Sequence, residues 1–291
     1  QGHRLSHEDN RQGAPLFHLQ GRLSCPNINL YDTPFPFQSK GNFFSSGPEA
    51  SGYVAFHIMY YYTHLRGLEQ MMYDIYDEPE LFHALVGILE TGYQSIVDQC
   101  ENQGLFHRND NGTYQSTGGF GYTSTLLPPD FDPDHVRPCD MWACAEAQEM
   151  AQVSPEQTEE FCISAERRLL ARFGRNGYGC CEPVQGELPY IKQIHALRRV
   201  SVSPFADVDA CARELKGDYI FSWKCSPFLV SSPDFSPDAL RAYFRRYLPV
   251  LKEEGCHVEM ILADTHTCHN EPQRFPIWVR LAREAVQEIC G

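Results

Sequence analysis

The sequence lacks long apolar runs and has no excess of positive charge. No segment of the 291-residue sequence approaches the ~20 consecutive apolar residues that a membrane span needs. Its first residues, QGHRLSHEDNRQG, are too polar for a signal peptide. The formal charge of −14 disfavours contact with phosphate backbones and anionic lipids. We therefore expect a cytoplasmic protein with no nucleic-acid partner and no membrane partner.

A disulfide framework and a phosphate-binding loop are also missing. The chain has twelve cysteines, but it is long and carries no secretory signal, so we expect reduced thiols. Cys180 and Cys181 are adjacent, and neighbouring residues rarely meet the geometry of a disulfide. The glycine-rich residues 118–121 lack the lysine and the spacing of a P-loop.

From residue 67 onward, helical periods alternate with short apolar runs, which is typical of βα units. The apolar residues of 78–104 recur on one helical face and predict a long helix. Ser154 and Ser236 each precede a proline, and this pair of residue types predicts a capped helix start. A last helix is expected to begin near Glu271.

The expected strands form a parallel sheet with right-handed crossovers. Six are predicted, at residues 15–20, 113–117, 177–181, 198–203, 218–223 and 257–263. Because eight strands close a barrel, the predicted fold class is α/β, a TIM-like (β/α) barrel that lacks the first one or two βα units. Residues 1–291 are expected to form one domain, with 22–66 as a loop or lid. An open sheet exposes apolar edges, which predicts a homodimer or an incomplete chain.

Soft metal ligands follow two of the expected strands. Cys181 and Glu182 come after the strand at 177–181, and His266 and Cys268 come after the last strand. Function collects at the carboxyl ends of parallel strands, and these residue types bind catalytic zinc. The competing interpretations are a buried core thiol for each cysteine and an incidental surface loop for His266 and Cys268. Arg199 would lie at the opposite end of its strand, where residues serve stability.

Further polar and aromatic residues are expected at the same edge of the sheet. Lys224 and Asp264 are the candidate catalytic groups, with Lys224 as a cation for a carboxylate or phosphate. Trp223, Phe205 and Ser203 are the candidate substrate-binding residues. For Lys224 the competing interpretation is a surface lysine whose stem covers apolar neighbours.

Three segments carry a resemblance to a known family: GYGCCEP at 177–183, RRVSVSPFADVDACARELKGDYIFSWKCSP at 198–227, and EMILADTHTCHNEPQRFPIW at 259–278. Together they resemble a bacterial branch of the uroporphyrinogen decarboxylase superfamily, over roughly residues 65–290. The resemblance implies a TIM-like barrel. It also implies a corrinoid-dependent methyltransferase, which moves a methyl group between a small methylated substrate and cobalamin on a partner corrinoid protein.

The resemblance further implies zinc held by a His-x-Cys pair and by a late cysteine. Here Gly179, Cys180 and Cys181 stand where the first pair would be, so the histidine is absent. Cys268 fits the late cysteine, and His266 could replace the missing imidazole. The alternatives are a uroporphyrinogen decarboxylase, although the arginine-rich first-strand motif of that enzyme has no counterpart here, and a non-catalytic tetrapyrrole-binding barrel.

Overall fold

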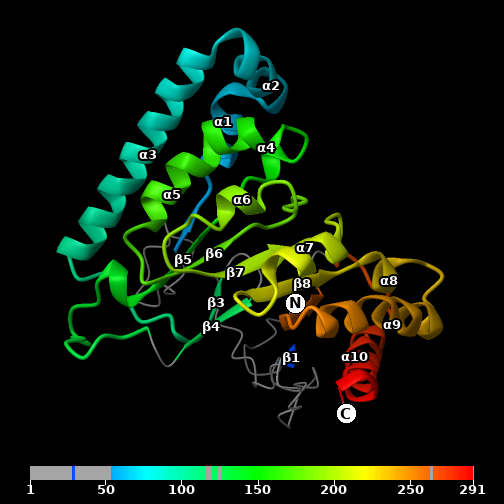
Figure 1. Cartoon of the computed structure of the whole chain (residues 1–291). Helices are drawn as coiled ribbons and strands as arrows, with labels where there is room; N and C mark the ends of the chain where they lie inside the picture. Colours follow the sequence, from blue (N-terminus) through cyan, green and yellow to red (C-terminus); the bar gives the residue numbers. More distant parts are fainter. Residues whose placement is uncertain (1–27, 30–53, 116–118, 124–125, 263–264, 291) are drawn as a thin grey trace, which may run out of the picture.

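A computed structural model describes residues 28–29, 54–115, 119–123, 126–262 and 265–290 (Figure 1). Its main feature is a seven-stranded sheet of order β1-β9-β8-β7-β6-β5-β2, in which every neighbouring pair is parallel. In chain order its strands are β1 (Ile28–Asn29), β2 (Ala55–Phe56), β5 (Trp142–Ala145), β6 (Arg175–Tyr178), β7 (Leu197–Val202), β8 (Ile220–Cys225) and β9 (His257–Leu262). The expected α/β class with a parallel sheet is thus confirmed.

The strands from β5 to β9 lie side by side in the order of the sequence. This singly wound order is the one found in (β/α) barrels, where each strand pairs with the next along the chain. The short strands β1 and β2 form the two edges of the sheet, and no pairing between these two described strands is present. The topology therefore places every carboxyl end of the sheet on one side.

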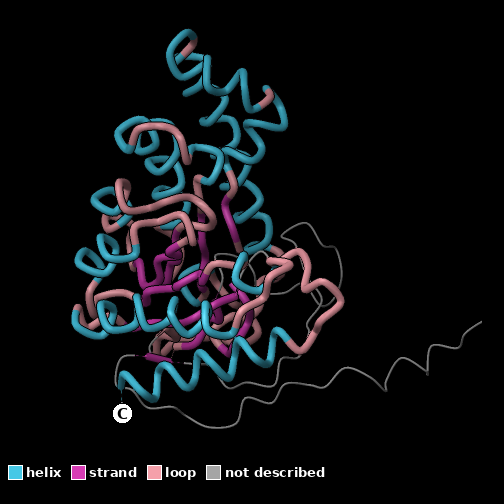
Figure 2. Tube along the Cα trace, turned by 90° about the vertical axis from the view of Figure 1, so that its right-hand side faces the viewer, coloured by secondary structure: helices cyan, strands magenta, loops and turns pink. Residues whose placement is uncertain are grey.

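Helices cover one face of this sheet (Figures 1 and 2). The helices of the described residues are α1 (Ile58–Arg66), α2 (Leu68–Asp77), α3 (Pro79–Asn102), α4 (Pro155–Thr158), α5 (Ser164–Leu170), α6 (Leu188–Ile191), α7 (Val208–Leu215), α8 (Phe228–Ser231), α9 (Pro237–Glu253) and α10 (Arg274–Cys290). A π-helical turn (Glu159–Ile163) joins α4 to α5, and short 3₁₀ turns occupy Pro138–Asp140 and Gln148–Met150. No helix within the described ranges is long and apolar enough to cross a membrane.

Two of the predicted helix starts are confirmed by their caps. The Ser154 hydroxyl accepts a hydrogen bond from the Gln157 amide at 3.3 Å, and Ser236 accepts one from Ala239 at 3.2 Å. Each cap satisfies a backbone N–H that has no partner within the first turn of the helix. The long helix expected at 78–104 is α3, and the last expected helix is α10.

The two faces of the sheet differ in chemistry. Side chains of Phe56, Tyr178 and Trp223 pack under the helices, where Phe56 contacts Tyr93 of α3 and Trp223 stacks on Tyr243 of α9. Because successive strand residues alternate between faces, their neighbours point to the opposite side, which we call the inner face. It carries the side chains of Trp142, Arg199, Ser201, Ser222, Lys224 and Glu259, all buried.

A two-stranded hairpin, β3 (Asn111–Gln115) and β4 (Gly119–Tyr122), covers part of the inner face. A Cβ atom on Gly119 would overlap the Arg199 guanidinium and the Glu259 carboxylate, so the backbone lies directly on these groups. The strand predicted at 113–117 was expected in the parallel sheet, and this is wrong. It pairs antiparallel with β4 in a sheet of its own, because only three residues separate the two strands in the sequence.

Three strands of the main sheet were not predicted: β1, β2 and β5. Residues 142–145 form the fully buried β5, and residues 55–56 form β2, followed at once by α1. The expectation that 22–66 forms only a loop or lid is therefore wrong for 55–66, which is a βα unit. The strand expected at 15–20 lies outside the described residues.

Candidate functional site

Six polar side chains gather where four strands of the sheet end, and we call them the carboxyl-end cluster. Its members are His57 after β2, Glu146 after β5, Cys180, Cys181 and Glu182 after β6, and Lys224 near the end of β8. The His57 Nδ1 atom lies 2.8 Å from Glu146 Oε1, and the second Glu146 oxygen accepts the amide of Gln148 at 2.8 Å. The cluster thus brings together, at the carboxyl ends of the strands, residues up to 167 positions apart in the sequence (224 − 57).

Glu182 is fixed at the centre of this cluster by the backbone. Its Oε1 atom accepts the Ala147 amide at 3.0 Å and its Oε2 atom accepts the Cys180 amide at 2.8 Å. The side chain is buried, and this loss of solvent, with the nearby carboxylate of Glu146, raises the pKa of Glu182 to about 7. At neutral pH this carboxyl group is therefore divided between its protonated and ionised forms.

A second buried acid lies on the helix face next to Glu182. Glu166 of α5 is 0% exposed, and one of its oxygens accepts the hydroxyl of Tyr178 at 2.8 Å. Burial, together with the charge of Glu146, raises the pKa of Glu166 well above its usual value, so its protonated form is favoured. Burial and the same neighbour raise the pKa of Glu149. This region has more carboxyl groups than it can ionise together.

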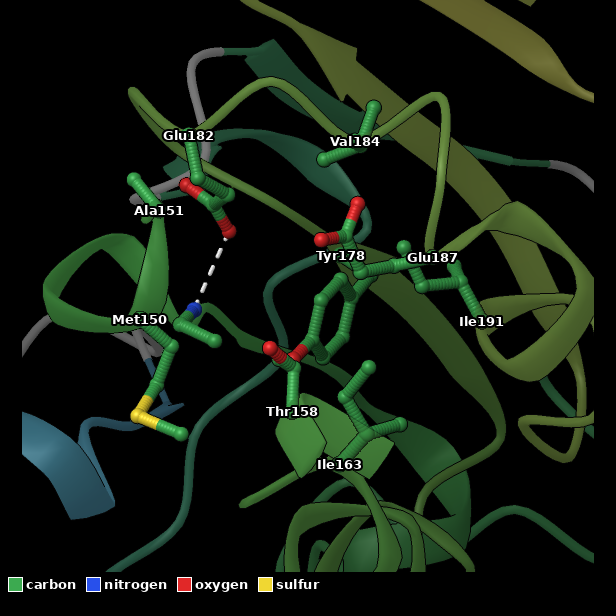
Figure 3. Close-up of a pocket in the computed structure, with 10 residues that line it drawn as sticks. Met150, Ala151, Thr158, Ile163, Tyr178, Glu182, Val184, Glu187 and Ile191 are labelled. Atoms are coloured by element: carbon green, nitrogen blue, oxygen red, sulfur yellow. Dashed lines mark hydrogen bonds between the residues drawn. The ribbon is translucent and has the colours of Figure 1, made fainter. Parts of the chain in front are cut away.

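A small cavity adjoins Glu182 (Figure 3). Its polar lining comes from Glu182, Glu187, Tyr178 and Thr158, and the rest is apolar. The cavity has room for about one water molecule. In Figure 3 the carboxyl group of Glu187 points into this space above the ring of Tyr178. The cavity can therefore hold a proton carrier but not an organic substrate.

Lys224 connects β8 to the loop after β6. Its ammonium group donates to the Cys180 carbonyl at 2.8 Å and lies 3.5 Å from the Cys180 sulfur. The Ser201 hydroxyl donates to the same carbonyl at 3.3 Å. The hydrogen bond to Cys181 and burial raise the pKa of the Cys180 thiol, although the Lys224 charge acts in the opposite direction. The lysine is buried, so the surface interpretation of Lys224 is wrong.

The expected four-residue zinc set is not assembled by the described residues. Both oxygens of Glu182 already accept backbone amides, and the side chain of His266 is exposed in the loop after β9. Cys268 is half-buried in the same loop. Within the described ranges, no three histidine, cysteine, aspartate or glutamate side chains are arranged so that they could hold a metal ion. Only Cys181 and Glu182 of the four lie in the cluster.

The other predicted residues are dispersed. Trp223 is fully buried on the helix face, away from the side of the sheet that Lys224 faces. Ser203 is buried and its hydroxyl accepts the Phe205 amide at 3.2 Å, which makes it a turn residue, while the Phe205 ring is 66% exposed. Asp264 lies outside the described residues. The structure thus brings Lys224, Cys181 and Glu182 together and leaves Trp223, Ser203 and Phe205 apart from them.

His57, Glu146 and Glu166 were not predicted. Glu146 directly follows the apolar run at 141–145, and recognising that run as a strand would have placed Glu146 at a carboxyl end. His57 follows the two-residue strand β2, which is too short to leave a periodic signal. Glu166 lies in a helix among residues that carry no distinguishing pattern.

The inner face carries a buried ion pair. The Arg199 Nε atom lies 2.5 Å from Glu259 Oε1, and both side chains are almost fully buried. The guanidinium also lies over the ring of Trp142, with its carbon 5.1 Å from the ring centroid. The position of Arg199 near the start of β7 agrees with the stabilising role expected from the sequence.

The fold and the cluster define a class: a singly wound parallel α/β protein with an acid-rich site at the carboxyl ends of its strands. Comparison of the chain with family models, with curated proteins and with solved structures found no match.

Proposed function

We propose that this protein is a methyltransferase of the (β/α)-barrel type, which moves a methyl group between a small methylated compound and a corrinoid on a partner protein. The resemblance of the three segments noted in the sequence supports the family. The observation that carries the proposal is Glu182, a buried acid with a pKa of about 7 at the carboxyl end of a singly wound sheet.

Demethylation of an oxygen or nitrogen donor needs a proton for the leaving group. A corrinoid supplies the cobalt nucleophile that accepts the methyl group. When the bond from methyl carbon to heteroatom breaks, the electron pair remains on the heteroatom, and a proton from Glu182 neutralises it. Glu182 then carries the negative charge until it takes a proton from solvent. The carboxylate of Glu146 favours the protonated form of Glu182 between turnovers.

The remaining members of the cluster position this acid. The amides of Ala147 and Cys180 fix the two carboxyl oxygens, and the Lys224 ammonium fixes the Cys180 carbonyl. His57 holds Glu146 at 2.8 Å. An acid held by three strands loses little orientational freedom when substrate binds, which is how such groups accelerate proton transfer.

The expected zinc ligands do not fit this arrangement, because the Glu182 oxygens are bound to backbone amides and His266 is exposed. No step of the proposed mechanism uses a metal. Zinc on Cys181, Glu182, His266 and Cys268 stays a prediction, and elemental analysis of the purified wild type and of Cys268→Ala tests it. Stoichiometric zinc that is lost in the variant would restore a Lewis-acid role.

The direct test combines the chain with a reduced corrinoid protein and a panel of methoxy, methylamine and methylthiol compounds. Formation of methyl-Co(III), followed by absorbance, is the expected result with at least one donor. Glu182→Gln should lose this activity, whereas Glu160→Gln, which removes an exposed carboxylate in a surface pair with His83, should keep it. Conversion of uroporphyrinogen to coproporphyrinogen without methyl transfer would replace the proposal with the decarboxylase alternative.

A further inference from the structure

The two adjacent cysteines of the carboxyl-end cluster lie within reach of each other. The Cys180 and Cys181 sulfur atoms are 3.6 Å apart, and both side chains are half-buried rather than enclosed. By contrast, Cys144, Cys162, Cys211, Cys225 and Cys256 are buried in the core. The pair therefore combines contact between the two thiols with access for a small reagent, which a core cysteine lacks.

A cation and a glycine turn adjoin the pair. The Lys224 ammonium lies 2.8 Å from the Cys180 carbonyl oxygen and 3.5 Å from the Cys180 sulfur, so it fixes the position of this residue beside Cys181. Gly179 precedes the pair with φ +92°, a backbone conformation that glycine adopts without strain. The Cys180 backbone is bound on both sides, by Glu182 at its amide and by Lys224 and Ser201 at its carbonyl.

We infer that Cys180 and Cys181 are a redox modification site that reacts with low-molecular-weight disulfides and closes to a disulfide between the two neighbours. One thiol of the pair loses its proton to solvent, attacks a sulfur of the reagent and forms a mixed disulfide, and the released thiolate takes up a proton. The second protein thiol likewise loses its proton, attacks the protein sulfur of that mixed disulfide and releases the other small thiolate, which is protonated in turn. Two protein thiols are oxidised, and one small disulfide is reduced to two thiols.

A disulfide between adjacent residues is strained, because consecutive Cα atoms are closer together than disulfides usually require. Strained disulfides are reduced readily, so the modification is reversible. Closing the ring turns the Cys180 peptide, which holds Glu182 through its amide and Lys224 through its carbonyl. If the proposed function is correct, oxidation therefore displaces the catalytic acid and stops methyl transfer.

The full-length chain, reduced and then treated with oxidised glutathione, tests the site by peptide mass spectrometry. The peptide that contains residues 180 and 181 should lose two hydrogen atoms and carry no glutathione, and dithiothreitol should restore it. Cys139, an exposed cysteine with no neighbouring cysteine in the sequence, is the internal control and should gain only a glutathione adduct. A 180–181 peptide that keeps both thiols while Cys139 reacts overturns the inference.

Two variants exclude other pairings. In Cys180→Ser and in Cys181→Ser the remaining thiol should take at most one glutathione and form no intrachain disulfide, with circular dichroism confirming the native fold. A disulfide from either remaining cysteine to a third cysteine would overturn the assignment. Methyl transfer is measured separately. An oxidised protein that is as active as the reduced one overturns the regulatory consequence. Absence of activity in the reduced protein overturns the proposed function, and the mass-spectrometric result then tests the redox site by itself.

Discussion

Buried carboxyl groups occur in two regions of this molecule with opposite surroundings. On the inner face, Glu259 faces the Arg199 guanidinium, so each charge has its counterpart. At the carboxyl ends, Glu182 faces backbone amides and the carboxylate of Glu146, and Glu166 faces the hydroxyl of Tyr178. The first region is balanced in charge, and the second has an excess of acid.

The difference indicates which region can exchange protons. In a buried pair of a carboxylate and a guanidinium, removing one partner leaves the other charge buried and costs stability. A carboxyl group buried near another carboxylate is held close to its protonated form, as in the site of a general acid. The Arg199–Glu259 pair is thus expected to stabilise the sheet, and the carboxyl-end cluster to act on a substrate.

The largest effect is expected for Glu182→Gln on the rate of methyl transfer. The amide keeps the shape of the side chain but has no acidic proton, and general acids contribute about 10²–10⁴-fold to rate. The rate constant for methyl-Co(III) formation should fall by that factor for oxygen and nitrogen donors. In the wild type it should also decrease above pH 7, where Glu182 ionises.

The matched control for that variant is Glu160→Gln, an exposed acid at the π-helical turn. It should retain the wild-type rate and pH profile. A Glu182→Gln protein that keeps its fold and turns over as fast as the control would show that the acid-rich region has no catalytic role.

The second prediction tests the charge-balanced region. Arg199→Met leaves the Glu259 carboxylate buried without its cation, and breaking such a pair costs roughly 3–5 kcal/mol of unfolding free energy. Urea denaturation of the variant measures this. Arg245→Met, which removes an arginine from an exposed pair with Glu288, should cost about 0–1 kcal/mol. Equal losses in the two variants would contradict the stabilising role of the inner face.

The sequence predicted the helices and the central strands of this fold better than it predicted the site. The helix over 78–104 and the capped starts at Ser154 and Ser236 rest on local patterns, and local hydrogen bonds confirm the caps. The strands at 198–203 and 218–223 rest on apolar runs, which the buried β7 and β8 match. These helix starts and strands depend on residues that are close together in the sequence, so they can be predicted from one sequence.

The site depends on which loops meet, and that information is not local. Lys224 was predicted because it ends an expected strand, and the structure brings it to Cys180. Trp223, the adjacent residue, was predicted for the same reason, but alternation along the strand turns it to the helix face. Glu146 was missed because the strand before it was missed. The prediction for Trp223 failed because the face of the strand on which it lies was not considered, and Glu146 was missed because β5 was not predicted.

A third prediction concerns stability as a function of pH. Because the pKa of Glu182 is raised from 4.5 to about 7 on folding, the native state binds its proton more tightly than the unfolded state does. This contribution is fully present below pH 4.5 and is lost as the pH rises to about 7, by on the order of 3 kcal/mol. Glu182→Gln should remove that decrease, so the difference in unfolding free energy between variant and wild type should change across this window. A constant difference from pH 4.5 to 7 would show that Glu182 titrates normally.

The smallest expected effect separates the two attractions that Arg199 makes on the inner face. Its guanidinium lies over the ring of Trp142 as well as against Glu259, and an indole is the most favourable ring for a cation. A double-mutant cycle of Trp142→Phe and Arg199→Met should give a coupling of about 1 kcal/mol. Trp278→Phe, at a buried indole that contacts Phe244 on the helix face, should show no coupling to Arg199→Met. If Trp142 and Arg199 also fail to couple, the ion pair with Glu259 alone accounts for the contribution of Arg199 to stability.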